Sequence, residues 1–156
     1  MAVAMSLYGT AVLRLLLAAA YGAAVGWERE RHDKAAGLRT HILLAIGACL
    51  FALVTLRMGD GDTLRVVQGI LLGTGFICGG VIFRRGPTVK GLTTATGLWV
   101  TGAAGLAAGV GEYFLAAVGT ALALIVIALL PHDRHERGEK TAGEATGGEA
   151  PDSGAD

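Results

Sequence analysis

The chain has 156 residues, of which 53% are hydrophobic and 17% charged, and its formal net charge is zero. That much apolar surface exceeds what a soluble single domain can bury, so the composition excludes a soluble domain and predicts a polytopic membrane protein of the all-α class. The charged residues are concentrated between apolar runs, as in membrane spans joined by polar loops.

Five apolar runs follow one another along the chain. They cover residues 7–27, 41–56, 66–83, 93–111 and 113–130. At a helical rise of about 1.5 Å per residue, they reach roughly 24 to 32 Å, which suits a hydrocarbon core of about 30 Å. We therefore predict a bundle of five transmembrane helices. The weakest boundary is 109–112, which we interpret as a tight hairpin, with one long broken helix as the alternative.

The polar stretch at residues 26–41 determines the predicted orientation. Lys and Arg near the ends of membrane spans favour the cytoplasmic side. With the N-terminus outside, the cytoplasmic side receives ten Lys and Arg, namely Arg29, Arg31, Lys34, Arg39, Arg84, Arg85, Lys90, Arg134, Arg137 and Lys140. The outside receives Arg57 and Arg65. The sequence therefore predicts a multi-pass membrane protein with a cytoplasmic C-terminus.

The composition changes after Pro131, where no aromatic or branched apolar residue follows. Such a segment cannot bury enough apolar surface to offset its ordering entropy. We predict one transmembrane domain over residues 1–130 and a disordered cytoplasmic tail over residues 131–156.

Glycines spaced four apart predict close contacts between helices. In lipid, such spacing lets two backbones approach and pack. The predicted packing glycines are Gly69, Gly73, Gly75, Gly79, Gly105 and Gly109. A compact bundle explains them, and helix sliding or a narrow passage stays open as the alternative. A leucine at position 75 or 79 is expected to separate the third helix from its neighbour.

Arg14 is the one cation inside an apolar run, roughly 10 Å from the outer end at the helical rise. A cation at this depth either extends toward water or finds a partner. Glu112 is the carboxylate nearest in depth, and Asp60 and Asp62 are alternatives. Whether Arg14 pairs or simply extends to the interface is left open here.

Charged and hydroxyl side chains mark the two longest cytoplasmic loops. Glu30 and Lys34 are four apart, a favourable pair on a continuing helix, and the run at 28–31 is either a solvated face or a docking site. Thr93 and Thr94 are placed to cap the fourth helix. A capped helix start beside several cations attracts anions, including lipid headgroups.

No arrangement of nucleophile, base and orienting group is present, and no phosphate-binding or nucleic-acid-binding pattern, so we expect neither an enzyme nor a nucleic-acid partner. His32 and His41 do not have metal-ligand spacing, and Cys49 and Cys78 are interpreted as buried free thiols. No cofactor or metal site is expected.

Several motifs together resemble the MgtC/SapB family of bacterial membrane proteins. They are Gly26-x-Glu28-Arg29-Glu30, 36–41 (Ala-Gly-Leu-Arg-Thr-His), Gly75-Phe76, 80–84 (Gly-Val-Ile-Phe-Arg), 90–95 (Lys-Gly-Leu-Thr-Thr-Ala) and Leu98-Trp99. The resemblance covers about residues 12 to 130 in the family's order. It departs at Cys78, where a thiol replaces a glycine, and at Thr93, where some members have Asn. The soluble C-terminal domain of longer relatives is not expected in this sequence.

The resemblance implies a five-helix inner-membrane domain linked to growth in low magnesium and, in pathogens, to virulence. It implies a regulator that contacts another membrane protein, with an ion transporter or channel formed by oligomerisation as the alternative. The interaction candidates carried by the motifs are Glu28, Arg29, Glu30, Lys34, Gly37, Arg39, Thr40, His41, Arg84, Lys90, Gly91, Thr93, Thr94 and Trp99. Expected partners are the bilayer with its anionic headgroups, another membrane protein and a possible second copy of the chain.

Overall fold

The computed structural model describes residues 2–58, 63–85 and 88–130. Within them the elements are α1 (Ala2–Arg31), α2 (Leu38–Met58), α3 (Thr63–Gly80), β1 (Phe83–Arg85), β2 (Thr88–Lys90), α4 (Leu92–Val110) and α5 (Tyr113–Leu129). The all-α class is confirmed, and each predicted apolar run corresponds to one helix. The tail predicted over residues 131–156 lies outside the described residues.

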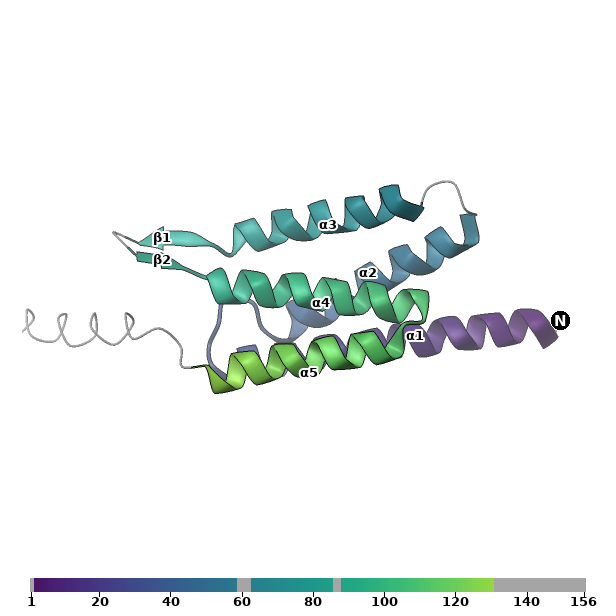
Figure 1. Cartoon of the computed structure of the whole chain (residues 1–156), viewed down its shortest axis with the longest axis horizontal. Helices are drawn as coiled ribbons and strands as arrows, with labels where there is room; N and C mark the ends of the chain where they lie inside the picture. Colours follow the sequence, from purple (N-terminus) through teal and green to yellow (C-terminus); the bar gives the residue numbers. More distant parts are fainter. Residues whose placement is uncertain (1, 59–62, 86–87, 131–156) are drawn as a thin grey trace, which may run out of the picture.

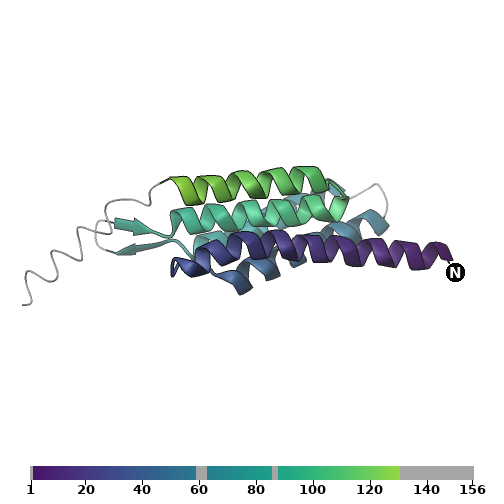
Figure 2. The same ribbon diagram turned by 90° about the horizontal axis from the view of Figure 1, so that it is seen from below.

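Successive helices run antiparallel, so the connections alternate between two ends of the bundle (Figures 1 and 2). The α1–α2 loop, the β-hairpin and the last turn of α5 lie together at what we call the loop end. The N-terminus and the α4–α5 turn lie at the opposite end. The α4 helix is central and contacts each of the other four. The predicted orientation, with cation-rich loops on one side of the membrane, requires this alternation. Which end faces the cytoplasm stays a prediction.

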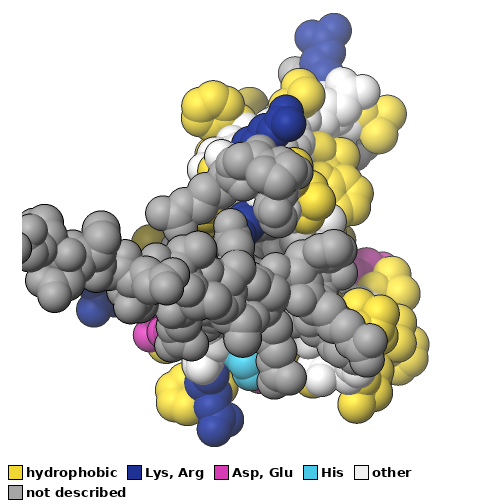
Figure 3. All heavy atoms as spheres, turned by 90° about the vertical axis from the view of Figure 1, so that its left-hand side faces the viewer, with side chains coloured by type: hydrophobic (Ala, Val, Ile, Leu, Met, Phe, Trp, Pro, Cys, Tyr) yellow, Lys and Arg dark blue, Asp and Glu magenta, His cyan; other side chains and the backbone are white. Residues whose placement is uncertain are grey.

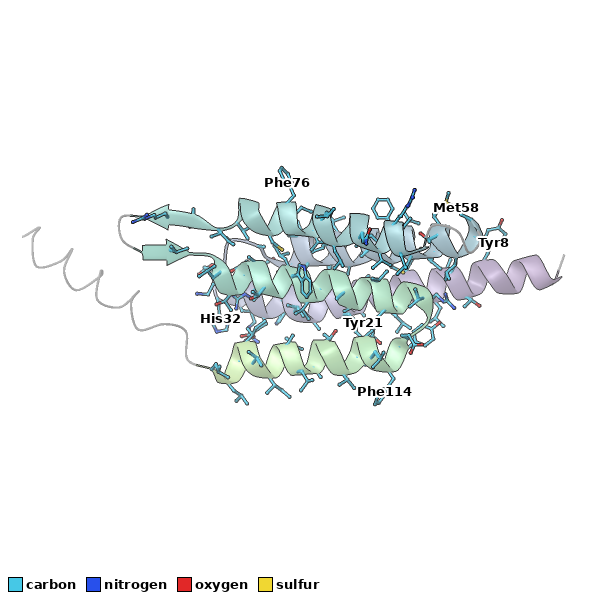
Figure 4. All side chains as sticks on the ribbon, turned by 45° about the horizontal axis from the view of Figure 1, so that its top comes forward. Tyr8, Tyr21, His32, Met58, Phe76 and Phe114 are labelled. Atoms are coloured by element: carbon cyan, nitrogen blue, oxygen red, sulfur yellow. The ribbon has the colours of Figure 1, made fainter. Side chains whose placement is uncertain are left out.

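Two described helices, Tyr8–Arg31 and Leu38–Met58, are long and apolar enough to cross a membrane by length and composition. The apolar segments Leu64–Gly80 and Tyr113–Leu129 are shorter. Large hydrophobic side chains are nevertheless exposed on all of these helices, and Phe76 and Phe114 point away from the bundle (Figure 4). An apolar surface this extensive requires lipid or a partner to cover it.

Small residues, rather than large apolar ones, form the core. Ala18, Ala45, Cys49 and Ala108 are fully buried and pack together where α1, α2 and α4 meet. The cysteine in this cluster and Cys78 are both buried and unbridged, as the sequence predicts. Short side chains allow backbones to approach, and dispersion between the closely packed helices then stabilises the bundle.

Glycines make the closest approaches between helices. A Cβ on Gly22 would lie 2.6 Å from the carbonyl oxygen of His41 on α2. One on Gly109 would lie 2.6 Å from the Cβ of Ala52, and one on Gly105 would collide with the backbone of Ala45. The two glycines of α4 therefore have the packing role that their spacing predicts.

The glycines of α3 do not have this role within the chain. A Cβ on Gly69, Gly73, Gly75 or Gly79 would meet no atom within 4 Å. The α3 helix instead approaches α4 through Thr74, whose side chain faces Gly102. The expectation that leucine at position 75 or 79 would separate α3 from a neighbouring helix is therefore wrong for contacts inside the chain.

Several boundaries differ from the sequence prediction. The α1 helix continues to Arg31, which shortens the first loop, and a β-hairpin follows α3, with Phe83 paired to Lys90. The α4 helix begins after Gly91, whose φ of 90° is the left-handed conformation that glycine adopts readily, and no side chain caps it. The predicted capping by Thr93 and Thr94 is therefore wrong. The α4–α5 turn at 111–112 confirms the predicted hairpin.

Arg14 ties three helices together at the end opposite the loop end. Its Nη1 donates to the carbonyl oxygen of Gly109 at 2.6 Å, and its Nε donates to the hydroxyl of Tyr113 at 3.2 Å. Glu112 is exposed at the turn, so the pairing of Arg14 with Glu112 is not formed. A carbonyl and a phenol satisfy the guanidinium where the sequence suggested a carboxylate.

Removing this contact should cost stability. We expect Arg14→Gln and Tyr113→Phe each to lower the free energy of unfolding by about 1 to 3 kcal/mol, because each breaks a hydrogen bond to a charged group. The double variant should lose less than the sum, since both changes remove the same contact. Melting temperatures in detergent measure these losses. Glu112→Gln is the control, and stronger coupling of Arg14 to Glu112 than to Tyr113 would contradict the observed geometry.

Candidate functional site at the loop end

The loop end brings together the end of α1, the 32–37 loop, the start of α2 and the start of α4 (Figure 1). Figure 3 looks onto this end, where Lys and Arg side chains protrude at the rim. Many of the interaction candidates expected from the sequence lie here. The structure separates them into a buried polar cluster, formed by Arg29, His41 and Thr94, and an exposed rim.

Arg29 points into the bundle. Only 3% of its surface is exposed, and its Nη2 donates to the hydroxyl of Thr94 at 3.2 Å. Its Nε is buried and has no partner in the described part of the chain. Ala18, Gly22 and Val25 are buried on the same face of α1, at spacings of three and four residues. This spacing is the signal that would have identified Arg29 as an inward residue.

His41 lies next to this guanidinium and is fully buried. Its Nδ1 lies 2.9 Å from the carbonyl oxygen of Gly37, and because a carbonyl only accepts, Nδ1 must carry the proton. The Nε2 of a neutral ring is then an acceptor, and it has no partner among the described residues. A Cβ built on Gly97 would come within 3.9 Å of it, so α4 passes close to this nitrogen.

A hydrogen bond between a side chain and the backbone holds the loop between α1 and α2. The Oε2 of Glu30 accepts from the backbone N–H of Leu38 at 2.6 Å, which ties the start of α2 to the end of α1. Gly37 leaves the space that this carboxylate occupies. Because α1 ends at Arg31, the helical spacing predicted for Glu30 and Lys34 does not apply. Glu28 forms an ion pair with His32 at 3.2 Å when that ring is protonated.

The other candidates are dispersed. Arg39 and Thr40 are exposed on the first turn of α2, and Thr93 is exposed on α4. Trp99 is half-exposed on the surface of α4. Gly91 lies against Val81, where any Cβ would collide with the carbonyl oxygen. Arg84 and Lys90 belong to the β-hairpin. The structure therefore does not gather the motif residues into one site.

A further contact beside the cluster was not predicted from the sequence. The Sγ of Cys78 donates to the carbonyl oxygen of Ala95 at 3.0 Å, joining α3 to α4. A thiol is a weak donor. Every residue has a backbone carbonyl, so the residue types do not show which carbonyl accepts from the thiol.

The buried cluster offers one donor and one acceptor. The Nε–H of Arg29 and the Nε2 of His41 both lack partners in the described structure, and a bound water or a polar group of another molecule could satisfy each of them. No group of three or more His, Cys, Asp and Glu that could hold a metal occurs in the described ranges. The cluster thus has a positive charge buried among helices.

Residues 15–135 match the MgtC family, a range that includes the whole cluster and all five helices except the start of α1. The chain belongs to the MgtC family. Members of this family are membrane proteins, in keeping with the long apolar helices α1 and α2. The resemblance noted from the motifs is confirmed.

Three curated relatives illustrate the range of names in the MgtC family. The chain is 42% identical over 126 residues to the uncharacterized protein slr0014 of Synechocystis sp. (strain ATCC 27184 / PCC 6803 / Kazusa), covering 80% of this chain and 54% of that protein. It is 39% identical over 126 residues to the putative magnesium transporter YhiD of Escherichia coli K12, covering 74% of this chain and 58% of the relative. It is 42% identical over 110 residues to protein MgtC of Brucella abortus (strain 2308), covering 70% and 46%.

The chain therefore spans about half the length of these three relatives. No solved structure matches it.

Proposed function

We propose that this chain acts in adaptation to low magnesium as a multi-pass protein of the bacterial inner membrane that binds another membrane protein and catalyses no reaction. Membership of the MgtC family and the name of one relative, a putative magnesium transporter, support the link to magnesium. A regulatory mode, rather than conduction by the chain itself, is supported by the charges inside the bundle.

Buried Arg29 is the observation that carries this choice. It is the charged residue buried in the described bundle, and half-buried Arg14 toward the opposite end has the same sign. The carboxylates of Glu28 and Glu30 lie in the last turn of α1 at the loop end, half-buried and exposed respectively. A pathway for Mg²⁺ needs oxygen ligands, usually carboxylates facing the interior. Cationic side chains at both ends of the bundle would instead repel a divalent cation. A buried guanidinium is suited to receive a carbonyl or carboxylate from a partner.

The outer face of α3 is the surface we assign to the partner. Gly75 and Gly79 lie on it with space for a Cβ, and Leu72 and Phe76 beside them are 76% and 85% exposed. Figure 4 shows Phe76 pointing away from the other helices. Small residues four apart allow a second helix to approach closely.

We expect the double variant Gly75→Leu, Gly79→Leu to fold normally, because the added side chains meet open space, and to fail to support growth in low magnesium. Growth of a deletion strain expressing each variant measures function, and membrane-fraction yield measures folding. Affinity capture after magnesium withdrawal should recover the same membrane protein in repeated experiments with the original chain, and should not recover it with the variant.

Gly119→Leu on α5 is the matched control, since a Cβ there also meets nothing within 4 Å. It should retain growth and capture. Normal growth and normal capture with the α3 double variant would overturn the assignment of this face. Recovery of a second, differently tagged copy of the chain would show that the partner is another copy and that the chain forms a homo-oligomer.

Ion transport is the second candidate, because one relative is called a putative magnesium transporter. Flux of Mg²⁺ into liposomes that contain only the purified chain would favour transport. We expect no flux above that of empty liposomes.

A further inference from the structure

An open groove runs between α2 and α3. Its volume is about 770 Å³, which is within the range of roughly 300 to 1,000 Å³ typical of small-molecule sites. Its walls are almost entirely apolar, with Leu43, Phe51, Val66, Ile70 and Ile77 among the lining residues. Besides Thr74, the polar lining residues are Arg39 and Thr40, both in the first turn of α2. Polar groups are therefore concentrated at the loop end of the groove.

Glycines keep the groove empty. Gly47 on α2 and Gly69 and Gly73 on α3 line it, and a Cβ on any of them would meet no atom within 4 Å. In Figure 1, α2 inclines away from α3 toward the loop end. The groove is thus formed by absent side chains and by the divergence of two helices.

The length of the groove matches one leaflet of a bilayer. From Arg39 to Phe51 the α2 helix rises about 18 Å at 1.5 Å per residue. Half of a hydrocarbon core of about 30 Å is roughly 15 Å. A chain that begins at Arg39 and follows the groove would end near the middle of the membrane.

Arg39 provides charge complementarity for a phosphate. Its side chain is exposed, and no carboxylate in the described part of the chain is paired with it. A guanidinium presents a planar set of donors that matches phosphate oxygens, and the Thr40 hydroxyl adds a donor beside it. One charged end on an apolar groove of leaflet length has the chemistry of a single phospholipid.

We propose that this groove binds one anionic phospholipid, with an acyl chain between α2 and α3 and its phosphate on Arg39. The site is distinct from the outer face of α3, because Gly69 and Gly73 lie about a third of a turn around that helix from Gly75 and Gly79. None of Leu72, Gly75, Phe76 and Gly79 lines the groove. It also differs from the start of α4, where the sequence suggested headgroup binding. Failure of the lipid site would therefore leave the proposed partner face untouched.

Native mass spectrometry of the full chain, purified in detergent, tests the proposal. Phosphatidylglycerol and phosphatidylcholine with identical acyl chains are offered in equal amounts. We expect one phosphatidylglycerol to be retained with about fivefold preference, the effect of one cation near a membrane surface. Arg39→Gln should abolish the preference. Gly73→Phe and Gly69→Phe should fill the groove and reduce retention of both lipids.

Arg31→Gln is the control, since this exposed cation at the same end does not line the groove. It should leave the preference unchanged. Melting temperatures show whether each variant is folded, and the surface change Arg39→Gln tests the proposal even if a phenylalanine variant does not fold. Equal retention of the two lipids by the original chain, or equal losses for Arg31→Gln and Arg39→Gln, would overturn it. Disulfide-linked dimers of Phe51→Cys would assign the groove to a second copy and overturn it as well.

Discussion

Gly105→Leu is expected to leave little folded protein in the membrane. A Cβ at this position would collide with the carbonyl oxygen of Ala45 and lie 2.8 Å from its Cα, so α2 and α4 would have to separate. Both clashing atoms belong to backbone and cannot rotate away. Overpacking of a core costs about 1 to 3 kcal/mol where side chains can adjust, and we expect a larger loss here.

The yield of detergent-soluble protein and its melting temperature measure this effect. Gly109→Leu should behave similarly, because its Cβ would lie 2.6 Å from that of Ala52. Gly119→Leu is again the control and should leave both quantities nearly unchanged. Similar yields for leucine at 105 and 119 would show that α2 and α4 are not in backbone contact.

Arg29→Met should raise the melting temperature and abolish growth in low magnesium. Methionine keeps much of the length of the side chain and removes a buried charge that has no carboxylate partner in the described structure. Replacing buried charges by apolar residues of similar size often stabilises a protein by about 1 to 4 kcal/mol. Loss of function with a gain in stability would identify a charge kept for binding rather than for folding.

Arg31→Met, on the exposed side of the same turn, is the matched control. A change within about 0.5 kcal/mol is expected at such a surface position. Arg29→Ala should be less stable than Arg29→Met, because it also leaves a cavity. If Arg29→Met melts as low as Arg29→Ala, the guanidinium stabilises the fold and its burial is structural.

The helices and their order were predictable because each is a continuous apolar run. The β-hairpin was not, since β1 and β2 have three residues each and themselves contain charged residues that the sequence assigned to a loop. Two three-residue strands carry too little alternation to be distinguished from a loop.

The packing of α3 was not predictable from its spacing. Gly75 and Gly79 have the same separation as Gly105 and Gly109, yet the first pair is open and the second pair touches α2. The spacing shows that a backbone can be approached, and it does not encode which helix approaches.

The buried cluster was predictable in part. Glu28, Arg29 and Glu30 were recognised as a motif, but Arg29 was treated as a loop cation because charge runs usually lie in water.

The partners of Arg14 include the carbonyl oxygen of Gly109. Every residue has a carbonyl, so residue types give no sign of which one accepts.

Evolutionary drift in this bundle should run opposite to that in soluble proteins. The fully buried positions Ala18, Ala45 and Ala108 already hold small residues, so we expect natural variation there to be restricted to glycine, alanine, serine and cysteine. Most of the large apolar residues face outward, where leucine, isoleucine, valine and phenylalanine can replace one another freely. Across homologues, the smallest side chains should change least and the largest should change most.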